Sequence, residues 1–196
     1  MTIKKGEAWG EPGTFPSDGV IVDSDRAASR LLEAARLAGR EFPVIGMSAG
    51  DLCHTLGGRG DLTMTFTVDV GEALIDGRHH YFLAHLTAQE GGRWRRFVVA
   101  MNAQWIGDWN FGPRAHPNDG LLDVSEADLQ RFEWHKVRAR LATGSHLPHP
   151  RIKTQRTTAI TLEFPKAVAV LVDGEEIDAA RVVVLRLLPD ALRVFA

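Results

Sequence analysis

The stretch Ala159-Ile-Thr-Leu-Glu-Phe-Pro-Lys-Ala-Val-Ala-Val-Leu-Val172, which Asp173-Gly174 follows, decides the fold class of this sequence. Its two halves, 159–164 and 167–172, are rich in β-branched and aromatic residues, as is typical of short β-strands. The Asp-Gly pair is a strong signal for a hairpin turn. Two further strands and one turn are expected downstream, at Arg181–Arg186, Ala191–Phe195 and Pro189-Asp190.

The same pattern extends upstream to about residue 61. Strand-like runs lie at Thr63–Val70, His80–His85 and Arg96–Met101, and the turn signals Asp76-Gly77 and Gly91-Gly92 separate them. Many short strands joined by tight turns predict a β-sandwich or an open barrel.

One helix is expected within this β-rich part, from Ser125 to Leu141. Ser125 with Asp128 resembles a capping box at its start. Four apolar residues at helical spacing would face the core: Leu129, Phe132, Val137 and Leu141.

The first 60 residues follow a different pattern. After a Gly- and Pro-rich irregular lead-in to residue 18, we expect strands at Gly19–Val22 and Phe42–Gly46 and helices at 23–38 and 48–56. Asp23-Ser-Asp25 supplies capping oxygens at the start of the first helix. This β-α-β-α unit is too small to close a doubly wound sheet. The sequence therefore predicts an α/β remnant over residues 1–60 and a mainly β (α+β) sandwich domain over residues 61–196.

Composition excludes several classes of protein. The 196 residues are 44% apolar, and 23 Lys+Arg against 25 Asp+Glu leave a formal charge of -2, which argues against a general nucleic-acid binder. The single cysteine, Cys53, excludes a disulfide framework or a thiolate zinc cage and fits a reducing compartment. No apolar run approaches the ~20 residues of a membrane span, and the N-terminus lacks a signal-peptide pattern, so we expect a cytoplasmic protein.

Three acidic patches are candidates for chemistry. The loop Pro113–Val124 contains Pro-Asn-Asp-Gly, which is either a plain turn or a loop of carbonyls and one carboxylate that suits Mg²⁺. The run Asp173-Gly-Glu-Glu176 is either a hairpin turn or a strand end whose carboxylate accepts a proton from a substrate hydroxyl. Asp69 interrupts an apolar strand. Because burial of an unpaired charge is costly, its side chain is expected to be either outward-facing or paired with a partner, and the outward-facing side chain is the default expectation.

Other reactive residue types have structural interpretations. Adjacent His79 and His80 point to opposite faces of a strand and make a poor zinc site. His146 and His149 are expected in a packed or solvated loop, and Cys53 has no neighbouring basic pair that would activate it. Core packing is expected for four tryptophans, with a membrane-facing lip as the alternative: Trp94, Trp105, Trp109 and Trp134.

Four motifs together resemble a known family: Met101-Asn-Ala-Gln-Trp-Ile-Gly107, Pro113-Arg-Ala-His-Pro-Asn-Asp-Gly-Leu-Leu-Asp-Val124, Gly144-Ser-His146 and Asp173-Gly-Glu175. Their order and approximate spacing resemble the C-terminal β-sandwich domain of bacterial diacylglycerol kinase and sphingosine kinase-like lipid kinases. The resemblance covers roughly residues 64–196. It implies the same β-sandwich fold here.

A fainter resemblance covers Pro43–Gly57, which is similar to the family's Gly-Thr-x-Asn-Asp segment with the helix that follows it. Asp51 matches the family's aspartate, whereas Ser48 occupies the position of the threonine and Gly50 that of the asparagine. The resemblance places nucleotide contacts at Ser48 and Asp51. The family's Gly-Gly-Asp-Gly-Thr loop, which cradles ATP phosphates on the preceding strand–turn–helix, is absent from these 196 residues.

The resemblance also implies roles for the acidic patches. A structural Mg²⁺ would be held by the Asp119 carboxylate with the backbone carbonyls of His116 and Leu121. Glu175 matches the family's proton-accepting glutamate, and Asp69 matches the aspartate that works with it.

The lead interpretation is a diacylglycerol/lipid kinase-like protein, catalytically impaired, that binds a lipid or a small hydroxyl ligand, with ATP not expected to bind. The alternative is an active ATP-dependent lipid kinase whose nucleotide site is unconventional or shared between subunits. A third class is a non-enzymatic protein-interaction module. No nucleic-acid partner is expected, while a homodimer and peripheral contact with the inner membrane face stay open.

Overall fold

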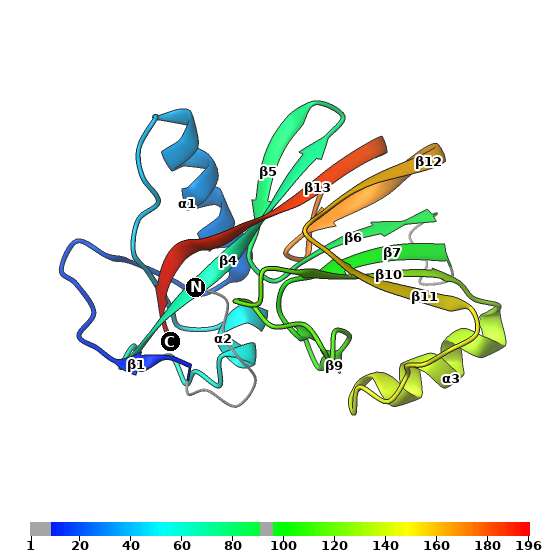
Figure 1. The fold of residues 1–196 in the computed structure, drawn as a ribbon, viewed down its shortest axis with the longest axis horizontal. Coiled ribbons are helices and arrows are strands. Elements are labelled where there is room, and N and C mark those ends of the chain that lie inside the picture. The colour runs from blue at the N-terminus through cyan, green and yellow to red at the C-terminus, as the bar shows by residue number, and fades with distance from the viewer. Residues whose placement is uncertain (1–8, 91–95) are drawn as a thin grey trace.

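The computed structural model describes residues 9–90 and 96–196 (Figure 1). The elements are β1 (Glu11–Pro12), β2 (Val20–Val22), α1 (Asp25–Leu37), β3 (Ile45–Met47), α2 (Asp51–Thr55), β4 (Met64–Ile75), β5 (Arg78–Phe82), β6 (His85–Gln89), β7 (Arg96–Met101), β8 (Trp105–Ile106), β9 (Trp109–Asn110), β10 (Leu122–Asp128), α3 (Arg131–Leu141), β11 (Ile152–Thr157), β12 (Ala159–Val172) and β13 (Glu175–Phe195). The expected turn at Gly91-Gly92 and Trp94 lie outside the described residues. The predicted mainly β class is confirmed.

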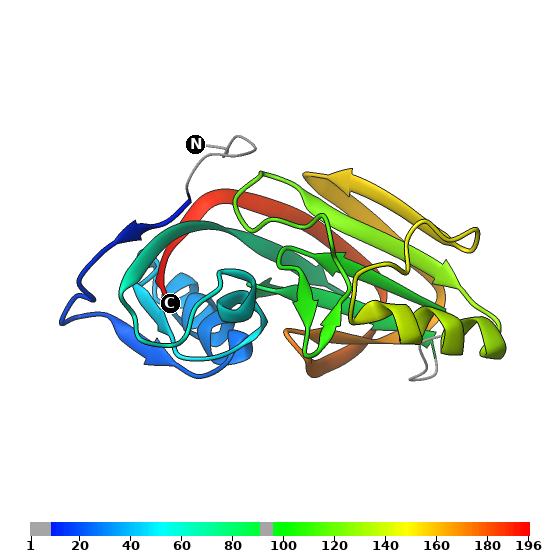
Figure 2. The same ribbon diagram turned by 90° about the horizontal axis from the view of Figure 1, so that it is seen from below.

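The long strand β13 organises the sheet. It pairs with β12 on one side and β4 on the other, so that Val183 lies opposite both Leu162 and Ile75. From β12 the sheet continues through β6, β7 and β10 to β11, always with antiparallel neighbours. Figure 2 shows β4 and β13 arching away from the layer that contains β7, β10 and β11.

The layers of this curled sheet enclose an apolar core, which includes Phe82, Leu86, Val170 and Leu185. Burial of side chains between facing layers is the main stabilising contribution in a β-sandwich. The predicted β-sandwich is confirmed.

Residues 20–55 form the expected strand–helix–strand–helix unit, which joins the same sheet. Strand β3 pairs in parallel with β2 and with the end of β13, where Ile45 lies opposite Val194. Ala28 and Leu32 of α1 belong to one apolar cluster with Val68 of β4. The unit therefore shares a core with the arch of β4 and β13.

The helix predicted from Ser125 to Leu141 is wrong at its start. Residues 122–128 form β10, which is hydrogen-bonded on both sides, to β7 and to the unpredicted strand β11. This pairing uses the backbone that a capping box would need, so the helix begins only at Arg131. Its capping box is formed by Gln130 and Glu133.

Strand boundaries also differ from the expected ones. The run His80–His85 is divided between β5 and β6. Residues 159–172 are one strand, whose pairing with β13 shifts register between Glu163 and Val168. The Pro189-Asp190 turn is instead an irregularity within β13, at which Asp190 has a φ of 51°.

A third core lies beneath α3. It contains Phe97, Phe111, Val137 and Leu141, and Trp109 and Trp134 pack against it. Phe132 was predicted to face the core but is 57% exposed. Within the described ranges, no helix combines the length and apolar character needed to cross a membrane.

Candidate functional site

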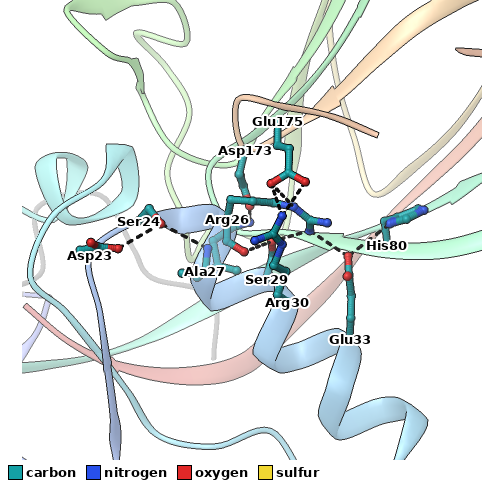
Figure 3. Close-up of polar contacts among 11 residues, drawn as sticks. Asp23, Ser24, Arg26, Ala27, Ser29, Arg30, Glu33, His80, Asp173 and Glu175 are labelled. Atoms are coloured by element: carbon teal, nitrogen blue, oxygen red, sulfur yellow. Dashed lines mark hydrogen bonds and ion pairs between the residues drawn. The ribbon is translucent and has the colours of Figure 1, made fainter. Parts of the chain in front are cut away.

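The Asp173-Gly-Glu175 motif forms the hairpin between β12 and β13, as predicted. Asp173 and Gly174 have positive φ values of 47° and 82°, which suits a tight hairpin turn. Glu175 then extends over α1, where Arg26 and Arg30 lie one helical turn apart (Figure 3). Arg30 Nη2 lies 2.6 Å from both carboxylate oxygens of Glu175, and Arg26 Nε lies 3.5 Å from Oε2. The predicted proton acceptor is therefore engaged by two arginines.

The charge network continues along α1 toward β5. Arg26 Nη1 donates to Glu33 Oε1 at 2.9 Å, and His80 Nδ1 lies 3.2 Å from the same oxygen. Burial acts to raise the pKa of Glu33, but the hydrogen bonds with His80 and Arg26 outweigh it and hold that pKa below its usual value. Glu33 therefore contributes to a chain of paired charges that holds α1 against the sheet.

Asp173 has a role that the sequence did not reveal. Its buried carboxylate accepts hydrogen bonds from three successive backbone N–H groups, of Leu83 at 3.0 Å, Ala84 at 2.9 Å and His85 at 3.1 Å. These bonds redirect the chain between β5 and β6, which is why the predicted strand at 80–85 is broken. Burial nevertheless raises the pKa of Asp173.

Asp51, a predicted nucleotide-binding residue, is occupied by contacts within the protein. One carboxylate oxygen, Oδ2, lies 3.0 Å from His85 Nε2, and the other accepts from Gly107 N at 2.8 Å. Ser48, the other predicted contact, is exposed and its hydroxyl donates to Val22 O at 3.0 Å.

The N-terminus of α2 is capped by Asp25 from the start of α1. Asp25 Oδ2 accepts from Asp51 N at 2.6 Å and Oδ1 accepts from Leu52 N at 3.1 Å. Burial and the charge of Asp173 outweigh these bonds and raise the pKa of Asp25 to about 7. A Cβ at Gly50 would lie 2.8 Å from Asp25 Oδ2, so this position accommodates glycine without a clash.

The strand–turn–helix that precedes this segment is β2–α1, with Asp23-Ser24 in the turn. The Ser24 side chain caps α1 by accepting from Ala27 N at 3.3 Å. The place where the family's glycine-rich loop is expected is thus a turn with acidic residues at 23 and 25. The sequence contained this signal as helix-capping residues, but it did not indicate that Asp25 reaches α2.

Asp69 is buried, so the default expectation of an outward-facing side chain is wrong. It is only 1% exposed, and its carboxylate accepts from Gly120 N and from Asp190 N, both at 2.8 Å. Burial raises its pKa. No contact recorded among the described residues joins Asp69 to Glu175, because Asp69 lies beside residue 190 of β13 and Glu175 begins that strand.

The Pro113–Val124 loop carries the donors predicted for Mg²⁺. Asp119 Oδ1 accepts from Leu121 N at 3.0 Å, while Oδ2 forms an ion pair with Arg156. The His116 backbone carbonyl accepts from Asp119 N at 3.3 Å. Among the described residues, no three His, Cys, Asp or Glu side chains gather closely enough to hold a metal ion. These donors fit Mg²⁺ poorly, because the one carboxylate is already paired with a guanidinium.

A cavity of about 680 Å³ opens between the first part of β12 and strands β7, β10 and β11. Apolar side chains line it, including Ala88, Val98, Leu162 and Val168, and charged side chains such as Arg96 and Lys166 stand around them. Its volume lies within the ~300–1,000 Å³ range of sites for small organic ligands. Nothing in the sequence pattern indicated this cavity, since its lining comes from five separate strands, β6, β7, β10, β11 and β12.

Comparison with known proteins agrees with this fold. The family model of the YegS C-terminal NAD kinase β-sandwich-like domain matches residues 66–196. A crystal structure of a diacylglycerol kinase from Bacillus anthracis strain Sterne is 18% identical, with a TM-score of 0.60 over 90% of this chain and 75% of that chain. A candidate diacylglycerol kinase from the same strain is also 18% identical, with a TM-score of 0.67 over 90% of this chain and 77% of that chain. No curated protein matches this sequence.

Proposed function

Because the chain belongs to the family of the YegS C-terminal β-sandwich-like domain, with a diacylglycerol kinase-like fold, we propose that it binds a hydroxyl-bearing lipid without phosphorylating it. The observation that carries this proposal is the ion pairing of Glu175 with Arg30 and Arg26. A general base needs a free carboxylate oxygen within hydrogen-bond reach of the substrate hydroxyl. Here both oxygens already accept from the Arg30 guanidinium, so a substrate hydroxyl would have to compete with that cation for Glu175.

The nucleotide side of the proposal rests on the two helix N-termini. Phosphate groups bind at such N-termini because their backbone N–H groups are free and the helix dipole is favourable. In this chain the Ser24 hydroxyl accepts a hydrogen bond from Ala27 N. The Asp25 carboxylate accepts hydrogen bonds from Asp51 N and Leu52 N. The exposed carboxylate of Asp23 would also repel a triphosphate. Phosphoryl transfer depends on positioning and charge stabilisation of the phosphate groups. With these backbone N–H groups already hydrogen-bonded within the protein, the chain lacks the groups that would position ATP.

The lipid side rests on the cavity beside β12. An apolar floor surrounded by charged side chains suits an acyl chain whose polar end stays at the surface. Arg96, at the rim, is already paired with Glu90 at 3.0 Å and Asp128 at 3.7 Å. A rim whose charges are mutually compensated favours a neutral head group, such as the hydroxyl of a diacylglycerol.

The enzymatic part is tested by incubating the protein with ATP, Mg²⁺ and diacylglycerol or long-chain bases in detergent. We expect no phosphorylated lipid and no thermal stabilisation by ATP or GTP. Glu175→Gln is expected to change the free energy of unfolding by less than about 1 kcal/mol, because the ion pair is well exposed to solvent. Turnover that disappears in Glu175→Gln would instead establish an active lipid kinase.

The binding part is tested with a fluorescent diacylglycerol analogue. Val168→Phe places a larger side chain in the cavity and should weaken binding at least tenfold. The matched control is Val182→Phe, the same substitution at a residue of β13 that is 40% exposed and outside the cavity lining. Equal affinity of the two variants would contradict the assignment of the cavity.

A further inference from the structure

The loop Pro113–Val124 brings two carboxylates close to one cation from a neighbouring strand. Strand β10 follows this loop, and its Asp123 lies directly opposite Arg156 of β11 in the antiparallel register. Arg156 Nε donates to Asp123 Oδ2 at 3.2 Å, and Nη2 forms the ion pair with Asp119 Oδ2. One guanidinium thus bridges the loop and the strand that continues from it.

The environment strengthens this bridge. The side chains of Asp119 and Asp123 are 18% and 16% exposed, and that of Arg156 is 31% exposed. Solvent screens charges less effectively at such half-buried positions than at the open surface. A guanidinium also presents several N–H donors in a rigid plane, so it can satisfy two carboxylates at once.

The rest of the loop is held by direct hydrogen bonds within the protein. Asp69 accepts from Gly120 N at 2.8 Å, and its own N–H donates to Pro117 O at 2.7 Å. Asn118 Nδ2 donates to Asp190 Oδ1 at 2.9 Å. These bonds hold the loop against β4 and β13.

We propose that the Arg156 guanidinium is the built-in cation of this loop and takes the place of Mg²⁺. A Mg²⁺ ion would have to displace a covalently tethered cation from Asp119 and lose some of its tightly held water. The proposal concerns this loop alone and does not depend on the proposed lipid-binding function.

The test compares thermal unfolding with and without Mg²⁺. The wild-type midpoint should differ by less than about 1 °C between EDTA and 10 mM MgCl₂. Arg156→Gln leaves two unpaired carboxylates beside carbonyl oxygens, and should lower the midpoint by about 2–8 °C. Mg²⁺ should restore at least half of that loss, because the emptied position now offers it oxygen ligands.

Two controls isolate the site. Arg151→Gln makes the same substitution just before β11, where Arg151 Nε pairs with Glu133 Oε1 at 3.3 Å; this variant should gain nothing from Mg²⁺. Adding Asp119→Asn to Arg156→Gln should abolish the Mg²⁺ response. An Arg156→Gln variant as stable as wild type, or one that Mg²⁺ does not rescue, would overturn the proposal.

A measurement on the wild-type protein tests whether the loop binds a divalent cation even where Arg156→Gln fails to fold. Mn²⁺ is titrated into wild type and into Arg156→Lys, which keeps one positive charge, and binding is followed by electron paramagnetic resonance. We expect no Mn²⁺ binding that Mg²⁺ reverses in either protein. Stoichiometric, Mg²⁺-reversible binding to wild type that Asp119→Asn removes would refute the inference.

Discussion

Substitution of Gly50 by alanine tests whether Asp25 truly fills the N-terminus of α2. Gly50 has a φ of +109°, and an added Cβ would lie 2.8 Å from Asp25 Oδ2 and 3.0 Å from its Cγ. A non-glycine residue in such a conformation costs about 1–3 kcal/mol. Displacement of a buried, hydrogen-bonded carboxylate adds about 1–3 kcal/mol. We therefore expect Gly50→Ala to lower the free energy of unfolding by about 2–6 kcal/mol.

The matched control is Gly57→Ala at the other end of the same short helix. Gly57 also has a positive φ, +72°, but nothing lies within 4 Å of its added Cβ. Gly57→Ala should therefore lower the free energy of unfolding only by the cost of the left-handed backbone conformation, about 1–2 kcal/mol. Urea denaturation followed by tryptophan fluorescence measures both values, with the slope of the transition checked for constancy.

A double-mutant cycle separates the clash between the new Cβ and Asp25 from the backbone strain at residue 50. Asp25→Ala removes the carboxylate, so in that background Gly50→Ala should cost about 1–2 kcal/mol less than in the wild type. A loss for Gly50→Ala no larger than that for Gly57→Ala, or an absence of coupling to Asp25, would refute the reasoning. The occupied helix N-terminus would then no longer argue against nucleotide binding.

Two further predictions concern buried carboxylates. The pKa of Asp25 is raised to about 7 and that of His85 is also raised, so their contribution to stability is present below their ordinary pKa values and is lost as the pH rises through the folded-state ones. Urea midpoints should therefore fall as the pH rises from about 4 to about 7, the interval between the ordinary and the folded-state pKa of Asp25, and Asp25→Asn should flatten that fall; an equal or steeper fall in the variant would contradict it. Asp69→Ala leaves the N–H groups of Gly120 and Asp190 unpaired and should cost about 3–5 kcal/mol. A loss below about 1 kcal/mol by denaturation would show that the carboxylate does not hold the loop.

The sequence predicted those features whose causes are local. The β-branched and aromatic residues of 159–164 and 167–172 and the Asp173-Gly174 pair act over a few residues. The structure confirms strand conformation in both halves, joined into the one strand β12, and the hairpin that follows. The helix start at Ser24 was similarly evident, because a capping serine acts within three residues.

Features with distant causes could not be predicted in this way. Ser125 and Asp128 have the residue types of a capping box, but their segment is a strand that pairs with β7 on one side and β11 on the other. The partners of Asp69 lie 51 and 121 residues away, and Arg30 lies 145 residues from Glu175. Without a predicted β11, nothing placed Arg156 opposite Asp123.

The three places where the family resemblance predicts ligand contacts share one physical property. Glu175 is paired with Arg30, the N-terminus of α2 is capped by Asp25, and Asp119 is paired with Arg156. A site kept ready for a ligand usually leaves polar groups unsatisfied until the ligand arrives, and this lowers the stability of the empty protein. Here each group has a partner within the chain, so an incoming nucleotide or metal ion would have to break an existing interaction. That arrangement favours a stable protein without nucleotide, and it supports the proposal that the ligand of this chain binds elsewhere, in the apolar cavity beside β12.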